Sequence, residues 1–303
     1  MRQSESSSNG LLFAIPGVAY AQKGSIQIEP AYIEVVLDQK SSEKQFDVTV
    51  KNNSSKNISL DIFPIDFQSS GVRGGITFLG QEASSYSYSL SSFLSFETNR
   101  LDIDSGEQRK LTVTVRNRPN LSPGGHYAAV VARLANDSKT SDANIISPAL
   151  SSLIFMRKEG GEIFNLSIRE VDFPSSAVSF GVPREVEAEF QNDGNVHVVP
   201  YGKLEIKDIF GRIVYKGVLN TSSAIVMPET RRIIATQVKK TGWMLPISLN
   251  EVSITGTDSL KKTSYLHKDS FFYINPFVLI IFFILIAYLI IRKRKQRERR
   301  QVK

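Results

Sequence analysis

Hydrophobic and polar residues alternate in short runs along most of the chain, and Gly, Asn, Ser and Pro separate the runs. Such alternation places one face of a strand in a core and the other in water, as in a β-sandwich. The predicted strands of the first half are 25–37 with a break at Pro30, 44–51, 58–67, 93–97, 108–116, 125–134 and 150–156. Those of the second half are 164–171, 184–192, 203–208, 213–219, 230–238, 245–255 and 265–273. No sustained helical period precedes Phe271, so this region is predicted to be all-β.

Two of these strands share a local pattern. Residues 46–52 and 186–192 each alternate apolar with polar positions, end in Asn and run into a polar turn. Many sandwich strands have this form, but the repeat also fits two immunoglobulin-like domains that each place the strand near their start. A charged, Gly-rich break at 157–161 (RKEGG) favours two domains. Residues 127–134 differ, since they are nearly all apolar or small and are predicted to be buried on both faces.

The C-terminal end predicts a membrane span. Residues 271–291 carry no formal charge. A helix of this length measures about 31 Å, close to the roughly 30 Å hydrocarbon core of a bilayer. Residues 292–303 follow at once with eight Lys or Arg and one Glu. Because basic flanks stay in the cytoplasm, we expect a single-pass plasma-membrane protein with the N-terminal domains outside and the tail inside.

The charge of the chain resides in that tail. The net charge is +7, and the residues before Arg292 carry 29 basic and 29 acidic side chains. The high isoelectric point therefore does not indicate a nucleic-acid-binding domain, which needs a basic face on a folded surface. We predict no nucleic-acid partner, and contact of the tail with anionic lipids.

The N-terminal end predicts a signal peptide. Residues 11–21 form a short apolar stretch that ends in the small-x-small pattern of Ala19 and Ala21. The segment before it is a poor n-region because Glu5 offsets the single Arg2, so either the true start lies elsewhere or the N-terminus is extended and uncleaved. We expect cleavage near Ala21. The exterior region has no Cys, which is typical of a prokaryotic surface protein held together by core packing.

The predicted organisation is all-β, with two tandem immunoglobulin-like β-sandwich domains followed by a single C-terminal transmembrane helix. Its parts are a probable signal peptide (1–21), domain 1 (22–158), domain 2 (159–270), the transmembrane helix (271–291) and a basic cytoplasmic tail (292–303).

Nothing in the sequence indicates catalysis. The chain has no nucleophile elbow, phosphate-binding loop, zinc-protease motif or dinucleotide fingerprint. His126, His197 and His267 are far apart and fall in or beside predicted strands, where histidines are most often surface or edge residues. We therefore predict no enzyme activity, no metal, no cofactor and no catalytic residue. Trp243 is expected to pack in a core.

One segment suits recognition. Residues 69–92 are rich in Ser and Gly, contain Tyr86 and Tyr88, and show little strand pattern. Long loops on sandwiches often carry function, and Tyr with Ser and Gly is a recognition-type composition. A flexible insertion without a partner is the equal alternative, and no binding residue is assigned.

A family resemblance lies in residues 25–156. The order IEPAYIEVVLDQ, FDVTVKNNSSKNISLDI and LDIDSGEQRKLTVTVRNRPNLSPGGHYAAVVARL resembles the N-terminal domain of the WxL-interacting family of bacterial cell-surface proteins. It is more distantly similar to the pilus-chaperone-like immunoglobulin fold. The resemblance implies attachment to cell-wall polymer through the first domain and protein binding through the second.

Two functional hypotheses follow. The first is a membrane-anchored surface binding or adhesion protein whose domains contact cell-wall polymer or another surface protein. The second is a pilus-chaperone-like assembly factor, in which an open sheet edge accepts a client β-strand.

Overall fold

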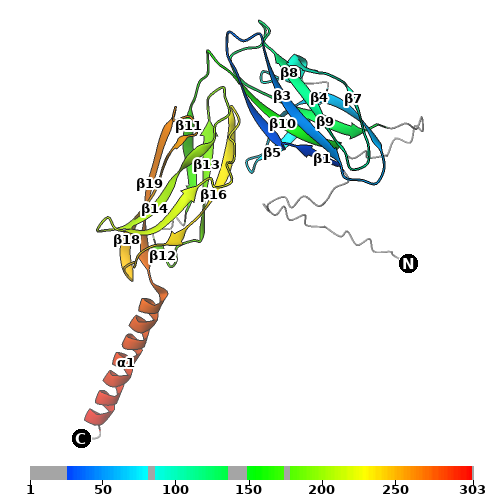
Figure 1. Cartoon of the computed structure of the whole chain (residues 1–303). Helices are drawn as coiled ribbons and strands as arrows, with labels where there is room; N and C mark the ends of the chain where they lie inside the picture. The colour runs from blue at the N-terminus through cyan, green and yellow to red at the C-terminus, as the bar shows by residue number, and fades with distance from the viewer. Residues whose placement is uncertain (1–25, 81–85, 136–148, 174–177, 302–303) are drawn as a thin grey trace, which may run out of the picture.

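The computed structural model describes residues 26–80, 86–135, 149–173 and 178–301. The predicted signal peptide, 1–21, lies outside the described residues. The chain forms two β-sandwiches in series and a C-terminal helix that projects from the second sandwich (Figure 1). The predicted fold class is confirmed.

The described residues of the first sandwich form ten strands. They are β1 (Ile26–Glu29), β2 (Tyr32–Leu37), β3 (Glu43–Asn52), β4 (Ile58–Ser70), β5 (Gly75–Leu79), β6 (Leu94–Phe96), β7 (Arg100–Ile103), β8 (Gln108–Arg116), β9 (Gly124–Leu134) and β10 (Ala149–Lys158). One sheet has the order β1-β3-β8-β6, and the other has the order β2-β10-β9-β4-β5 with β7 also on β4. The break predicted at Pro30 is where the chain leaves the first sheet for the second.

Nine strands make up the part of the second sandwich that the structure describes. They are β11 (Leu166–Asp172), β12 (Val178–Ser179), β13 (Glu185–Asn192), β14 (Pro200–Asp208), β15 (Ile213–Leu219), β16 (Thr230–Gln237), β17 (Lys239–Lys240), β18 (Ile247–Asp258) and β19 (Ser264–Ile274). A three-stranded sheet, β11-β13-β16, faces the six-stranded sheet β12-β19-β18-β14-β15-β17.

Each sandwich has its own core, built from the inward positions of alternating strands. In β3, Val48 and Val50 are fully buried while the residues between them are more exposed, as the alternation predicts. In β9 the residues from Gly124 to Ala132 are buried on both faces, because the second face packs against the other domain. The predicted burial of residues 127–134 is confirmed as far as Ala132, whereas Arg133 is exposed.

The repeat noted in the sequence has a structural basis. Asn52 and Asn192 are both fully buried at strand ends, and each carboxamide closes the following turn. The Asn52 Nδ2 atom donates to the carbonyl oxygen of Lys56 at 2.7 Å, and that of Asn192 donates to Val196 at 2.7 Å. Since the same bond spans the same four residues, each Asn fixes the turn that starts a new layer of its sandwich.

The described structure corrects two sequence boundaries. The segment 69–92 contains strand β5, which forms a hairpin with β4, so it is not one long loop. The C-terminal helix α1 (Pro276–Gln301) begins later than the predicted residue 271. Residues from Phe271 to Ile274 instead continue β19, because Phe271 belongs to the second core and Pro276 occupies the first turn of the helix.

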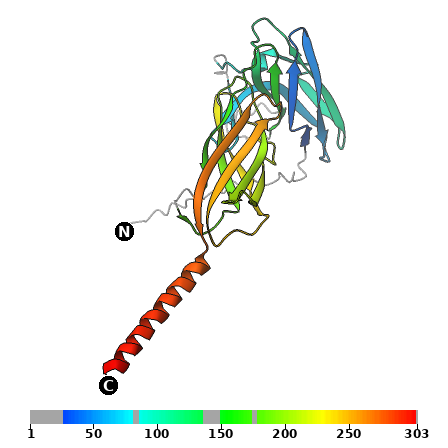
Figure 2. The same ribbon diagram turned by 90° about the vertical axis from the view of Figure 1, so that its left-hand side faces the viewer.

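Helix α1 is apolar on all sides over its first turns. The stretch Pro276–Gln296 is long and apolar enough to cross a membrane by length and composition, and none of its hydrophobic window is buried in the protein. In two views at right angles the helix points away from both sandwiches (Figure 2).

Candidate binding cleft at the domain junction

The two sandwiches meet through a small apolar cluster. The outer face of strands β4, β9 and β10 carries Phe67, Tyr127 and Phe155, which pack with Met227 of the second domain. The Tyr127 ring is fully buried and lies within 6.0 Å of Phe67 and 5.8 Å of Phe155 between ring centroids. The burial of large aromatic rings between the domains stabilises one relative orientation.

Polar contacts at several places reinforce this junction. The backbone N–H of Gly125 donates to the Asn195 carbonyl at 2.8 Å, and the N–H of Ile233 donates to the Val72 carbonyl at 2.7 Å.

The Arg73 guanidinium, in the turn between β4 and β5, forms two hydrogen bonds of 2.8 and 2.9 Å with the carboxylate of Glu187 on β13. Backbone pairing and a two-point ion pair together fix direction as well as distance, so the hairpin of domain 1 is docked on domain 2.

His197 is a titratable group inside the junction. Its ring centroid lies 5.6 Å from Tyr127 and 5.5 Å from Phe155, and its Nδ1 atom is 3.3 Å from the Tyr127 hydroxyl. Burial, and next the nearby cation of Arg157, lower the pKa of His197 to about 4. The imidazole is therefore neutral at physiological pH.

A polar cleft of about 350 Å³ opens in domain 1 beside this junction. Its lining is rich in hydroxyl groups and holds one amide, one imidazole and two aromatic rings: Asp66, Tyr86, Ser87, Ser89, Ser91, Ser92, Phe93, Asn120, Ser122 and His126. Half of these residues come from the segment 69–92 that the sequence singled out. The segment thus places its Tyr and Ser side chains at one concave site.

Asp66 organises the wall of this cleft. Its carboxylate is buried and accepts four hydrogen bonds, from the backbone N–H groups of Leu90 and Ser91 and from the hydroxyls of Ser89 and Ser91, at 2.6–2.8 Å. These bonds occupy the carboxylate oxygens, so Asp66 supports the loop rather than presenting a free charge to a ligand.

Tyr86 and Tyr88 connect the cleft to the second domain. Their rings meet edge to face, 5.7 Å apart between centroids. The Tyr88 hydroxyl donates to Oε1 of Glu229 in domain 2 at 3.0 Å. Burial, followed by that hydrogen bond to a carboxylate, raises the pKa of Tyr88 to about 12, and burial raises the pKa of Tyr86 as well. Both phenols are therefore neutral hydrogen-bonding groups.

His126 closes the floor of the cleft. Its Nδ1 atom lies 3.0 Å from the Ser89 carbonyl oxygen, and its Nε2 atom lies 2.9 Å from the Ser122 carbonyl oxygen. Burial lowers its pKa, although the two carbonyls oppose this shift. The Ser122 hydroxyl is 3.5 Å from Nε2, but in these contacts neither ring nitrogen faces a carboxylate, the orienting group of a hydrolytic triad.

The described structure changes the interpretation of the other singled-out residues. Within residues 26–80, 86–135, 149–173 and 178–301 no three His, Asp or Glu side chains gather as a metal site. His126 is buried, so the prediction of a surface or edge position was wrong for it, and His197 is partly buried at the junction. His267 lies on β19, and Trp243 is 63% exposed in the loop before β18 rather than in a core.

No family model matches the chain, and no curated protein matches it. The resemblance of residues 25–156 to the WxL-interacting family stays a prediction. Among solved structures, it is similar to the class 5 fimbriae chaperone CfaA, at 12% identity over 80% of this chain and 98% of that one, with a TM-score of 0.43.

Two other solved structures are the E. coli chaperone DraB and the Salmonella enterica SafA pilin in complex with the SafB chaperone. Each has 10% identity over 82% of this chain and 96% of that one, with a TM-score of 0.37. These likenesses concern the fold, and the function is argued below from this chain's own residues.

Proposed function

We propose that this protein is a membrane-anchored, non-enzymatic binding protein. The apolar part of helix α1 spans the plasma membrane, the basic residues from Arg292 onward lie in the cytoplasm, and the two sandwiches stand outside. The proposal is supported by the apolar stretch of α1, none of whose hydrophobic window is buried in the protein, and by the positive charge that follows this stretch directly.

The ligand we propose is a hydroxyl-rich cell-wall polymer, held in the cleft of domain 1. One observation supports this above the others: the described lining offers neutral hydrogen-bonding groups and two aromatic rings, while the carboxylate of Asp66 is occupied internally. A sugar chain presents many hydroxyls and apolar ring faces, and it fits a polar site with one or two aromatic surfaces. Among the described lining residues, a strongly charged ligand would find no free counter-charge.

Cosedimentation tests the ligand. The full chain in lipid nanodiscs is mixed with purified insoluble wall polymer and spun down. We expect the intact protein to sediment with the polymer and Tyr86→Ala to bind at least tenfold more weakly, a loss of about 1.4 kcal/mol. Tyr201→Ala is the matched control because Tyr201 is 42% exposed on the second domain. Equal binding by the Tyr86 variant, or no binding by the intact protein, would refute the proposed ligand.

The topology has its own test, because the chain contains no cysteine. Single cysteines are introduced by Ser264→Cys on β19 and by Arg300→Cys beyond the apolar stretch. In intact cells a membrane-impermeant maleimide is expected to label the first and not the second. Labelling of position 300 would reverse or abolish the proposed topology without affecting the cosedimentation result.

A second function, acceptance of a client β-strand, is favoured by the edge strand β5. This strand pairs with β4 alone among the described residues, and it exposes Ile76 and Phe78 at alternate positions. An open edge with two apolar side chains on one face is the arrangement used in β-strand addition.

A photoreactive phenylalanine in place of Phe78 distinguishes this function from polymer binding. It would yield covalent adducts with exported client chains in living cells. The same probe in place of Tyr201 is the control, and adducts no stronger at position 78 than there would rule the function out.

A further inference from the structure

Many of the exposed apolar side chains outside α1 gather at one end of domain 2. We call this set the apolar rim: Val178, Phe180, Ile209, Phe210, Ile213, Trp243, Ile247 and Leu249. Phe210 and Trp243 are the largest, with 67% and 63% of their surfaces exposed. Single exposed apolar residues are ordinary on soluble proteins, whereas a contiguous group of this kind marks an interaction surface.

Strand register places the rim beside the start of α1. Ile247 pairs with Ile274, the last residue of β19, and the N–H of Asn275 donates to the Pro246 carbonyl at 2.7 Å. Asp208, the last residue of β14, pairs with Asn250, so the turn that carries Phe210 leaves the sheet at this same end. The helix begins at Pro276, and both overall views show it leaving domain 2 there (Figures 1 and 2).

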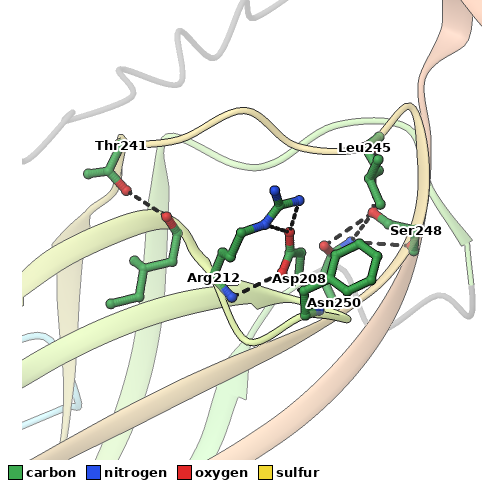
Figure 3. A network of polar contacts seen from close by, with 8 residues as sticks. Asp208, Arg212, Thr241, Leu245, Ser248 and Asn250 are labelled. Atoms are coloured by element: carbon green, nitrogen blue, oxygen red, sulfur yellow. Dashed lines mark hydrogen bonds and ion pairs between the residues drawn. The ribbon is translucent and has the colours of Figure 1, made fainter.

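The loops that present the rim are held in place by polar contacts. The buried Asp208 carboxylate accepts from the N–H of Phe210 at 3.0 Å and from the Arg212 backbone and guanidinium at 3.0 and 2.8 Å. Figure 3 shows this network with the neighbouring contacts of Thr241, Ser248 and Asn250. A turn braced in this way keeps its apolar side chain in solvent instead of folding it back into the core.

Trp243 is held in the same fashion. The N–H of the preceding residue, Gly242, donates to the Val214 carbonyl, and the following residue, Met244, is buried in the second core. Because both neighbours are anchored, the indole between them has no route into the core. Its exposure is therefore built into the loop.

Basic groups accompany the rim. The Arg212 guanidinium lies 5.2 Å above the centre of the Phe210 ring, and Lys239 and Lys240 are exposed on the edge strand β17. Trp and other amphipathic rings next to Lys and Arg form the composition that favours the headgroup region of a bilayer.

We propose that the apolar rim rests in the lipid headgroup region next to the chain's own span, with Trp243 and Phe210 as the inserted side chains. This inference depends on the proposed membrane anchor, since the span brings the rim to the bilayer. It also specifies how domain 2 is oriented on the membrane. Domain 2 contacts the lipid surface through the end that carries the rim, and it does not move freely about a flexible linker.

Trp243 is the single tryptophan of the chain, so its fluorescence reports the contact without labelling. The full chain is placed in nanodiscs that have a tryptophan-free scaffold protein and contain zwitterionic and anionic lipids, some of them spin-labelled near the headgroup. We expect the labelled lipids to quench Trp243 by at least half. We also expect iodide quenching to fall at least fivefold relative to the urea-unfolded chain. Ile209→Ser with Phe210→Ser is expected to double the iodide quenching, whereas Val218→Ser, a control 67% exposed in β15, leaves it unchanged.

Each other result overturns the inference in a recognisable way. If the chain travels with the nanodiscs on a sizing column but Trp243 stays open to iodide, the anchor stands and the rim contact is wrong. If Trp243 is shielded from iodide but not quenched by labelled lipid, a protein surface covers the rim instead. If the chain does not travel with the nanodiscs at all, the anchor and the inference fail together.

Discussion

Protonation of His197 is expected to weaken the domain junction in mild acid. The imidazole is enclosed by Tyr127 and Phe155 and faces the positive charge of Arg157, so the folded protein resists its protonation. In the unfolded chain the same group has an ordinary pKa near 6.5. Because the unfolded state takes up the proton first, stability is present above pH 6.5 and is lost as the pH falls from 6.5 toward 4.

The size of the loss follows from the two pKa values. With a folded pKa of about 4, lowering the pH from 7.5 to 5 destabilises the folded state by about 2 kcal/mol through this one group. Below pH 4 both states carry the proton, and the loss from His197 stops. The carboxylates and His126 also titrate in acid, so the contribution of His197 must be isolated by difference.

Urea unfolding of the full chain in nanodiscs, followed by far-ultraviolet circular dichroism, measures that difference. His197→Gln removes the titrating group, and His267→Gln on strand β19 is the matched control. Between pH 7.5 and pH 5 we expect the His197 variant to lose about 2 kcal/mol less stability than the wild type and the control. If the three proteins lose the same amount to within about 0.5 kcal/mol, His197 is not buried as a neutral group.

Three further substitutions test the polar supports of the two domains. Asn52→Ala and Asn192→Ala each leave carbonyl groups of a buried turn without their hydrogen-bond donor. Urea unfolding should therefore show that each lowers the free energy of unfolding by about 3 kcal/mol. The exposed Asn53→Ala is the control and should lower it by less than about 0.5 kcal/mol. A loss confined to one of the two would contradict an equivalent role. Asp66→Ala removes the acceptor of four hydrogen bonds and should cost about 3 kcal/mol while also weakening polymer binding. If a folded Asp66 variant bound the polymer as tightly as the wild type, the polymer would not bind in the cleft.

The strands could be predicted because alternation is a local signal of burial. Strand β3 and its counterpart β13 were visible from period-two patterning alone, and both end in the Asn that closes the next turn. The short strands β5 and β7 were missed. Among the described residues each pairs with β4 alone, and each has only four or five residues, too few for an alternating pattern to stand out.

The sequence-based predictions were wrong where the burial of a residue depends on its neighbours in the structure rather than on its residue type. Trp243 was expected in a core, but Met244 fills that position, and adjacent residues of an extended chain point to opposite sides. The boundary of the span was misplaced for a related reason. Phe271 is apolar because it fills the sandwich core, and only Pro276 marks the change from strand to helix.

The domain junction could not be predicted, because its parts come from distant segments. Tyr127 and His197 are seventy positions apart in the sequence, and no sequence motif around either residue predicts their contact. The composition of the 69–92 segment did indicate recognition, but its place beside the junction is set by Asp66 on strand β4 and by the docking of Tyr88 on Glu229. Such contacts exist only once both sandwiches are folded.

These features combine into a chain of fixed connections from the bilayer to the cleft. Helix α1 follows β19 after one residue, which leaves no flexible linker between the proposed span and domain 2. Domain 2 in turn holds domain 1 through buried rings, backbone hydrogen bonds and the Arg73–Glu187 pair. If the apolar rim rests on lipid, domain 2 has a fixed orientation on the membrane and domain 1 has a fixed orientation on domain 2. The cleft then lies at a fixed height above the membrane. Such an arrangement suits the proposed wall-polymer ligand. An immobile polymer cannot diffuse to the protein, so the protein must hold its binding site at the position of the polymer.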